Sequence, residues 1–531
     1  MKIAVINTGG TISCVGNPLA PMSAEQFASA SQQLIDPILQ QQFTDLQVDY
    51  LTSVTFPESS TKTLDSTNLQ PTDWCIMAKG ILDNYAAYDG FVVLHGTDSM
   101  DFSGTALSFL LNSFDSRGVG TAVLSKPVII TGSQVPLYYQ ANSSSPLTLN
   151  FNTDAFQNVC GAVAMAQSGI AEVGVYFQNH LYRGNRAVKT NASEFNAFSS
   201  PNYPVLAEYG VALTLNNANW LPGPVHSSVS LDDATVLAAQ QATLAAVTAS
   251  INNFPVMQLN AFPAYYSQSP AKSFMAGLID AVVAAGATGI ILASYGEGNF
   301  PSGNPDNPSQ GAIYQALDLA NEQGVNIVDC TQVLSAMVNS SAYAAGAWLP
   351  QVGALAPADM TPMSALAKLM ILTASASYNG WTRSQVQDLF QTDLAGEMLS
   401  VNQLDSRRNT TLLPGQSITA LDGSAQLLND PELGPVLTGA GAASPLWQLP
   451  SAPSANAMPG RLVMQDDGNL VFYGRDNQAL WATNTGNPAG ASSRLTLTGR
   501  YVAATPAAST LKLHVLNYSA NTIAATLYPA V

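Results

Sequence analysis

Positively charged residues are scarce in this chain. Its 531 residues include 18 lysines and arginines against 35 aspartates and glutamates, which gives a formal net charge of −17 at pH 7. Binding to nucleic acid depends on clustered Lys and Arg side chains that neutralise phosphates. The composition therefore excludes nucleic acid as an expected partner. Charged residues of both signs make up only 10% of the chain, so uncharged polar side chains must cover much of its surface.

Cysteines and long apolar runs are also scarce. The four cysteines, Cys14, Cys75, Cys160 and Cys330, show no CxxC spacing, which indicates neither a zinc site nor a disulfide framework. No apolar run approaches the ~20 residues of a membrane-spanning helix. The start, MKIAVINTGG, is typical of a short strand that leads to glycines rather than of a secretory signal. The cytoplasm is therefore the default expectation, with export by a route that uses no cleaved signal as the alternative.

The chain is long enough for roughly three or four domains, and its character changes along its length. Apolar, strand-like segments such as KIAVI and GFVVLH alternate with helical stretches. This alternation predicts mostly parallel sheets with helices on both faces. Later, short alternating strands with Gly, Pro, Ser and Thr predict an all-β domain, with a less regular tail after about residue 495. We expect a first α/β lobe over residues 1–215, a linker over 216–253, a second α/β lobe over 254–400 and the β domain over 405–531.

Two of the strand-like segments end in small polar residues. The segment VVLHGTDSMD, residues 92–101, passes from an apolar run to Thr97 and Asp98, and VINTGGTIS, residues 5–13, ends in two glycines and Thr11. Ligands of open α/β sheets bind beyond the carboxyl ends of the strands. Neither segment contains a nucleotide-binding GxGxxG or GxxxxGK[ST] motif. The alternative is purely structural, because a Thr in such a position can simply cap a helix.

Together these two segments resemble the asparaginase/glutaminase family of amidohydrolases, nearer to its cytoplasmic-type branch. The resemblance continues in order along about 400 residues, which makes it far more specific than one short motif. Its other segments are LDSTNLQPTDW (64–74), VIITGSQVPL (128–137), YRGNRAVKTNASEFNAFSSPN (182–202), ASYGEGN (293–299) and ADMTPMSALAKLM (358–370).

The resemblance implies a two-lobe fold and a threonine nucleophile that needs neither a metal nor a cofactor. It implies catalytic roles for Thr11, Thr97, Asp98 and Lys189, and substrate-binding roles for Gly10, Ser66, Thr67, Asp98 and Asn299. These residue types suit the reaction, because a hydroxyl nucleophile needs a nearby base. A lysine whose pKa is lowered by its surroundings can take the proton through a second hydroxyl. One departure is that the loop after Thr11, SCVGNPLAPMS, lacks the Tyr that the family carries there.

The β domain contains a second pattern, LVMQDDGNLVFYG, at residues 462–474. Alternate side chains of a strand share a face. We therefore expect one face to present Gln465, Asp467, Asn469, Val471 and Tyr473, and the core to receive Met464, Leu470 and Phe472. The first five match QxDxNxVxY and resemble the sugar site of bulb-type mannose-binding lectins. This implies a β-prism of three small sheets over about 408–495 and a mannose-type glycan as partner. The alternative is a half-buried strand with an ordinary polar face.

The sequence therefore predicts an amidohydrolase that releases ammonia from L-asparagine, and less well from L-glutamine, joined to a mannose-binding domain. The alternative is a carbohydrate-binding protein whose asparaginase-like lobes are weakly active or inactive, which the missing loop Tyr favours slightly. The resemblance also implies a homodimer or homotetramer, and it leaves a lysophospholipase activity open. An amidotransferase subunit that works with tRNA is disfavoured by the acidic composition.

Overall fold

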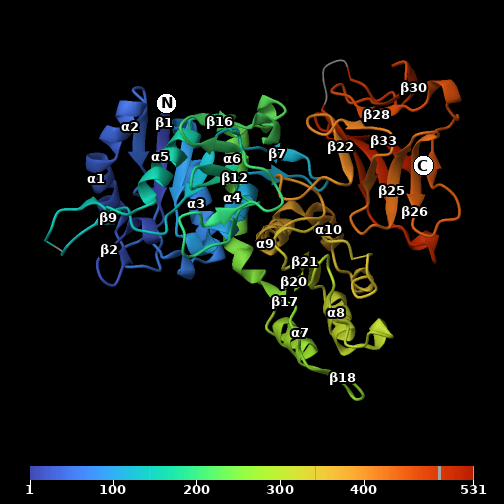
Figure 1. Ribbon diagram of the computed structural model, residues 1–531, viewed down its shortest axis with the longest axis horizontal. Helices are drawn as coiled ribbons and strands as arrows, with labels where there is room; N and C mark the ends of the chain where they lie inside the picture. Colours follow the sequence, from blue (N-terminus) through green and yellow to red (C-terminus); the bar gives the residue numbers. More distant parts are fainter. Residues whose placement is uncertain (143, 341, 488–491, 530–531) are drawn as a thin grey trace.

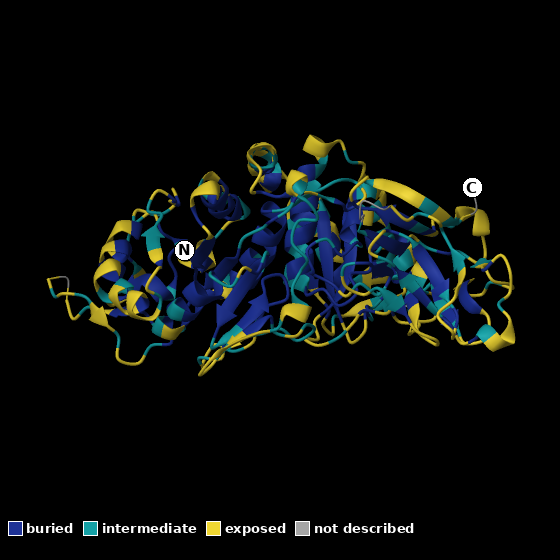
Figure 2. Ribbon diagram, turned by 90° about the horizontal axis from the view of Figure 1, so that it is seen from above, coloured by how far each residue is buried: buried dark blue, intermediate teal, exposed yellow. Residues whose placement is uncertain are grey.

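The computed structural model of the chain describes residues 1–529 except 143, 341 and 488–491, and it consists of three parts (Figure 1). The first α/β lobe lies at one end, and the β domain, in orange and red, lies at the other. The second α/β lobe, in green and yellow, extends below the junction of these two parts. Seen from above, buried segments run through the interior of the elongated molecule, and exposed segments follow its rim (Figure 2).

An eight-stranded sheet forms the centre of the first lobe. Its strand order is β16-β15-β12-β11-β8-β5-β1-β4. The run from β11 to β4 is parallel, whereas β12, β15 and β16 are antiparallel. The predicted parallel sheet is thus confirmed for five strands, and an antiparallel edge makes the whole sheet mixed. The bounds are β1 (Lys2–Asn7), β4 (Gln47–Tyr50), β5 (Gly90–Leu94), β8 (Val128–Thr131), β11 (Val173–Phe177), β12 (His180–Arg183), β15 (Ala207–Tyr209) and β16 (Leu213–Leu215).

Helices cover both faces of this sheet, as expected for strands that are apolar on both sides. Successive residues of β1 show the alternation: Ala4 and Ile6 belong to the core under α3 and α4, whereas Ile3 and Val5 belong to the core under α1, α2 and α5. The bounds are α1 (Ala24–Leu34), α2 (Asp36–Gln42), α3 (Pro71–Asp83), α4 (Met100–Leu110) and α5 (Ala155–Met165).

The segment predicted as a linker contains a long helix, α6 (Ala234–Ser250), which packs against α3 and α9. Asp233 begins it by accepting hydrogen bonds from the amides of Thr235 and Val236. The uncharged stretch Ala234–Asn253 has a mean hydropathy of 1.3 and is long enough to cross a membrane by length and composition. Gln, Thr and Ser interrupt its apolar residues, so the sequence shows no continuous apolar run here. Core helices of soluble proteins can have the same length and hydropathy, so one such helix does not by itself indicate a membrane span.

The second lobe contains a parallel sheet of three strands in the order β17-β20-β21. Helices α7 and α8 cover one face, and α9 and α10 cover the other. Helix α9 also packs into the core of the first lobe through Ala367 and Ile371, so it joins the two lobes. The bounds are β17 (Val256–Asn260), β20 (Gly289–Ser294), β21 (Asn326–Thr331), α7 (Phe274–Ala284), α8 (Ala312–Glu322), α9 (Pro362–Asn379) and α10 (Arg383–Phe390).

The β domain consists of three four-stranded antiparallel sheets that share one apolar core. Their strand orders are β22-β31-β32-β33, β23-β28-β29-β30 and β24-β25-β26-β27. The bounds are β22 (Gln403–Asp405), β23 (Thr411–Leu412), β24 (Ser417–Thr419), β25 (Ala425–Asp430), β26 (Gly434–Gly439), β27 (Trp447–Gln448), β28 (Arg461–Met464), β29 (Leu470–Tyr473), β30 (Ala479–Ala482), β31 (Ser493–Thr498), β32 (Lys512–Asn517) and β33 (Thr522–Tyr528).

The expectation of a less regular tail after about residue 495 is wrong. Strands β31, β32 and β33 occupy this part of the chain and form a complete sheet with β22. Alternate apolar residues such as Leu495, Leu497, Leu513 and Val515 are fully buried in the shared core. The sheet that contains β31, β32 and β33 therefore depends on the same alternation of buried and exposed side chains as the other two sheets.

Candidate active site

The tips of β1 and β5 lie side by side at the carboxyl edge of the large sheet. The two strands pair in parallel, with Asn7 opposite Leu94. A Cβ atom on Gly10 would lie 2.2 Å from the Cα of Gly96, so only glycine allows this close approach. Gly10 also has a φ of 74°, in the region that favours glycine. The short helix Thr11–Ser13 follows directly. Thr11, the predicted nucleophile, therefore lies at this edge of the sheet.

The segment around Ser66 lies against the same edge. The Ser66 hydroxyl accepts a hydrogen bond from the amide of Asp98 (3.3 Å), and the hydroxyl of Ser99 donates to the Ser66 carbonyl (2.8 Å). The Thr67 hydroxyl donates to Asp98 Oδ2 at 3.3 Å. The structure therefore brings the predicted residues Ser66 and Thr67 to Asp98, although 31 or 32 positions separate them along the chain.

Lys189 approaches this cluster from a two-stranded hairpin, β13 (Val188–Lys189) and β14 (Phe198–Ser199). Its Nζ donates to Thr97 Oγ1 at 2.8 Å and to Asp98 Oδ1 at 2.7 Å. The hydrogen bond from Lys189 lowers the pKa of Asp98, whose side chain is 60% exposed. An amine and a hydroxyl in direct hydrogen-bond contact form a path for a proton beside an open, charged surface.

Two buried titratable groups lie behind Thr97. Burial raises the pKa of Asp101 to about 6, and its carboxylate faces the backbone amide of Lys189 at 3.5 Å. Burial lowers the pKa of His95 to about 4, so its ring is neutral at pH 7 and forms a hydrogen bond with the Ser103 hydroxyl. The sequence reading did not single out Asp101. The available signal was its position one helical turn after Thr97, at the start of α4.

Asn299 lies apart from these residues. It follows β20 in the second lobe, where its backbone pairs with Tyr295. Its described contacts remain within that lobe, near Gly296 and Gly346. Within the described part of a single chain, the structure thus brings together Ser66, Thr67, Thr97, Asp98 and Lys189 beside the strand tip that precedes Thr11. Asn299 does not join them.

The loop after Thr11 forms a small hairpin, β2 (Cys14–Val15) with β3 (Ala20–Pro21). It presents Cys14 toward the Gly10 carbonyl, to which the thiol donates at 3.2 Å. Burial raises the pKa of this thiol to about 12, so it is not a thiolate nucleophile at pH 7. The hairpin therefore supplies no phenol and no reactive thiol to the site.

The pattern in the β domain lies on a hairpin and not on one strand. Strands β28 and β29 are joined by a tight turn in which the amide of Gln465 donates to the Asn469 carbonyl at 2.9 Å, and Gly468 has a φ of 89°. The expectation that all five side chains project from one strand is therefore wrong, because the sequence DDGN reverses the chain. The reversal still brings Gln465 to Tyr473, with Nε2 donating to the phenol oxygen at 2.7 Å.

The remaining members of this pattern differ in exposure. Asp467 is exposed, and Asn469 is half-buried and accepts a hydrogen bond from the Thr483 hydroxyl at 3.1 Å. Val471 is only 3% exposed, because Val463 and Ala482 flank it on the neighbouring strands. The hairpin thus offers polar side chains to solvent but little apolar surface.

Comparison with known families matches both α/β lobes. A family model described as "Asparaginase, N-terminal" matches residues 2–221, and one described as "Glutaminase/Asparaginase C-terminal domain" matches residues 271–390. The β domain lies beyond the end of both matches.

Individual proteins agree with these matches. L-asparaginase 1 of Escherichia coli is 34% identical over 313 residues, which cover 59% of this chain and 76% of that protein. The 60 kDa lysophospholipase of Mus musculus is 33% identical over 341 residues, but these cover only 49% of that protein. The solved structure of L-asparaginase I from Vibrio cholerae superposes with a TM-score of 0.54 at 28% identity, and covers 75% of this chain and 99% of that one.

Proposed function

We propose, since this chain belongs to the asparaginase family, that it is an amidohydrolase that releases ammonia from L-asparagine, with L-glutamine as a poorer substrate. The observation that carries this proposal is the position of Lys189 Nζ between Thr97 Oγ1 and Asp98 Oδ1, beside the strand tip that leads to Thr11. The same contacts favour a hydrolase over a carbohydrate-binding protein with inactive lobes, because they place an amine, a hydroxyl and a carboxylate together beside the strand tip that precedes Thr11.

In this proposal Thr11 attacks the side-chain amide carbon of the substrate. Thr97 and Lys189 accept the proton and return it to the departing ammonia, and water then hydrolyses the acyl-enzyme. Backbone amides near Gly10 and Thr97 stabilise the oxyanion, an effect of about 3–4 kcal/mol for each donor. Asp98 pairs with the ammonium group of the substrate, and Ser66 and Thr67 hold its carboxylate end.

We also propose a homodimer or homotetramer, in which Asn299 of one copy completes the site of another. The support is that the described contacts of Asn299 all lie in the second lobe, so it does not reach the first-lobe cluster of its own chain. Asp98 is 60% exposed in the single chain, which leaves room for such a contribution. The cytoplasmic location stays a prediction.

For the β domain we propose weak binding of a mannose-type glycan at the β28–β29 hairpin. The support is the set of polar side chains that this hairpin presents and the contact between Gln465 and Tyr473. The buried position of Val471 indicates that hydrogen bonds, and not apolar contact with the sugar ring, would dominate the affinity.

Ammonia release by the full chain tests the enzymatic proposal. The substrates are L-asparagine, L-glutamine and a short peptide that carries an internal asparagine. We expect the highest kcat/KM for L-asparagine. Absence of ammonia release from all three substrates by the folded protein would contradict the proposal and favour the carbohydrate-binding alternative.

A further inference from the structure

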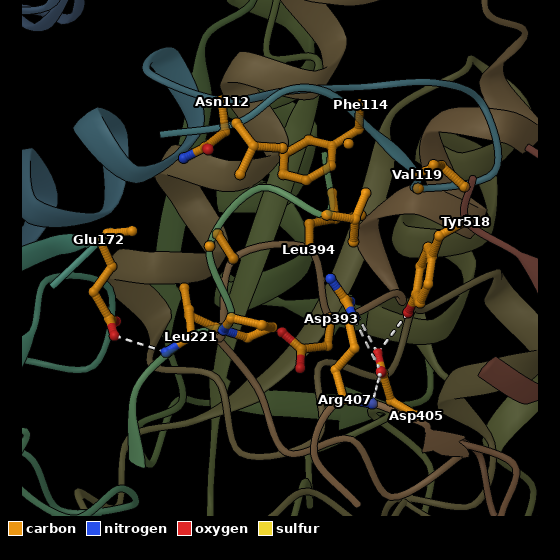
Figure 3. Close-up of a pocket in the computed structure, with 18 of the residues that line it drawn as sticks. Asn112, Phe114, Val119, Glu172, Leu221, Asp393, Leu394, Asp405, Arg407 and Tyr518 are labelled. Carbon is orange, nitrogen blue, oxygen red and sulfur yellow. Dashed lines mark hydrogen bonds and ion pairs between the residues drawn. The ribbon is translucent and has the colours of Figure 1, made fainter. Parts of the chain in front are cut away.

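A cavity of about 90 Å³ lies where the β domain meets both α/β lobes (Figure 3). The first lobe contributes the turn near Val119, the second lobe contributes the segment around Leu394, and the β domain contributes Asp405, Arg407 and Tyr518. A buried water needs roughly 10–15 Å³ of such space, so the cavity has room for several waters or for one small organic molecule. None of the candidate catalytic residues lines it.

The carboxylates that line this cavity already have cationic partners. Asp405 forms an ion pair with Arg407 at 3.0 Å and accepts a hydrogen bond from the Tyr518 hydroxyl at 2.5 Å. Asp393 pairs with Arg408 at 3.2 Å. The third carboxylate, Glu172, pairs with Arg183 at 2.6 Å, outside the lining.

Arg494 is the exception among the described residues of the lining. It is 4% exposed, and its Nη2 donates to the carbonyl of Arg117 at 2.6 Å. Its guanidinium carbon lies 5.7 Å from the centre of the Tyr518 ring. Its Nε has no hydrogen-bond partner, and no described carboxylate forms an ion pair with the guanidinium. A buried cation without a counter-charge is strongly unfavourable. This group therefore calls for an anion from outside the chain.

Gln403 supplies a second polar side chain to the lining of the same cavity. The residue is 2% exposed, and none of the described hydrogen bonds involves its side-chain amide. The register of β22 with β31 places Asp405 opposite Arg494 and Leu404 opposite Leu495 in the core. Because side chains alternate along a strand, Gln403, Asp405 and Arg494 all face away from the core of the β domain and toward the lobes.

We propose that this cavity binds a small monocarboxylate anion. One carboxylate oxygen accepts from Arg494 Nε, which thereby gains the acceptor it lacks, and the other accepts from the Gln403 amide. The short carbon body lies against Phe114, Val119 and Leu394. The paired but nearby carboxylates of Asp393 and Asp405 repel a second negative charge, which favours a monoanion over phosphate or a dicarboxylate.

The anion would connect the β domain to both lobes. Arg494 belongs to β31, whereas Leu394 and Ala395 belong to the segment after α10. The Ala395 carbonyl accepts from Asn185 at 2.8 Å, four residues before Lys189. Occupancy therefore stabilises the docked arrangement of the three parts, because a ligand that binds only the folded assembly raises its stability.

Titration of the full chain with trifluoroacetate, followed by ¹⁹F NMR, tests this proposal. We expect concentration-dependent broadening or shift of the signal that propionate reverses by competition. Arg494→Gln should weaken binding about tenfold or more, since hydrogen bonds to charged groups are the stronger class. Arg475→Gln, at an exposed position of the same domain and outside the cavity, is the matched control and should bind as the wild type does.

Gln403→Leu provides a variant that should fold even if Arg494→Gln does not, because it replaces a buried, unbonded amide by an apolar side chain. It should also weaken the binding of trifluoroacetate. No spectral change with the wild type, equal binding by the wild type and both cavity variants, or displacement by sulfate as effective as that by propionate would overturn the proposal.

Discussion

Lys189 Nζ lies 2.7 Å from Asp98 Oδ1, although 91 positions separate the two residues along the chain. The ion pair forms because the β13–β14 hairpin, which lies between the edge strands β12 and β15 in the chain, returns to the tip of β5. With Thr97 Oγ1 at 2.8 Å, the amine has one charged and one hydroxyl partner. This arrangement is the geometric core of the proposed chemistry, and it leads to the first prediction.

Lys189→Met should lower kcat for L-asparagine by about 10²–10⁴-fold, the range for loss of a general acid–base group. The unfolding temperature should change little, because an ion pair with a partly exposed carboxylate contributes little to stability. Steady-state ammonia release and a thermal melt check both expectations. Lys79→Met removes another lysine–carboxylate pair from an exposed helix face and is the control. Equal losses of activity in the two variants would contradict the role of Lys189.

Replacement of Thr11 distinguishes a role as the nucleophile from a role as a helix cap. Thr11→Ala should reduce turnover by orders of magnitude, whereas Thr11→Ser should retain a measurable part of it, because only the serine keeps a hydroxyl. Mass spectrometry after rapid quenching should detect an acyl adduct with the wild type and none with Thr11→Ala. An alanine variant that turns over at the rate of the serine variant would remove Thr11 from the mechanism.

The strands of the first lobe were predictable because local sequence determines them, whereas the site residues were expected from the family resemblance and their roles stay predictions. Continuous apolar runs become buried parallel strands, and the glycines after β1 allow the contact between Gly10 and Gly96. The β28–β29 hairpin was not predicted, because polar and apolar residues continue to alternate through its turn. This alternation alone does not reveal that the chain reverses at Gly468. The environment of Arg494 could not be predicted, because it depends on how three separately folded parts pack together.

The buried carboxyl of Asp101 should make stability depend on pH. Burial raises its pKa from 3.8 to about 6, so the folded chain holds this proton more tightly than the unfolded chain. The contribution of the protonated carboxyl to the free energy of unfolding is therefore fully present below pH ~4 and is lost as pH rises through about 6. Asp101→Asn should gain stability relative to the wild type over this window, by on the order of 3 kcal/mol at pH 7.

Thermal melts at pH 4, 5, 6 and 7 measure this difference for Asp101→Asn. Asp466→Asn, in the exposed turn of the β domain, is the control and should show a constant, small difference across the series. A difference between Asp101→Asn and the wild type that stays the same from pH 4 to pH 7 would show that Asp101 does not titrate there.

The ion pair between Arg408 and Asp393 should hold the β domain against the second lobe. Asp393 is buried and also accepts a hydrogen bond from the Ser400 hydroxyl at 2.6 Å. Arg408→Met leaves the Asp393 carboxylate with only the more distant charges of Arg186 and Arg183, so the loss should approach but not exceed the roughly 3–5 kcal/mol that breaking a buried ion pair costs. Adding Asp393→Asn should recover part of this loss. Chemical denaturation followed by tryptophan fluorescence measures both values, and additive losses in the double variant would contradict a direct pair.

The polar hairpin of the β domain should bind mannose independently of the catalytic site. Asp467→Ala combined with Asn469→Ala should abolish retention on immobilised mannose and leave ammonia release unchanged. The reason is that both side chains lie on the β28–β29 turn, in a sheet separate from the one that carries Arg494 toward the lobes. A single shallow site binds weakly, so retention should depend on linked copies, whose combined avidity can exceed that of one site by about 10²–10⁴-fold.

Asp476→Ala, which alters the exposed turn after β29, is the matched control for this experiment. It should be retained on the mannose matrix like the wild type, and free mannose should release both proteins. Retention of the double variant equal to that of the wild type would show that the hairpin is structural only. A parallel loss of ammonia release would show that the β domain acts on the catalytic lobes, because a domain that only anchors the enzyme cannot change its turnover in solution.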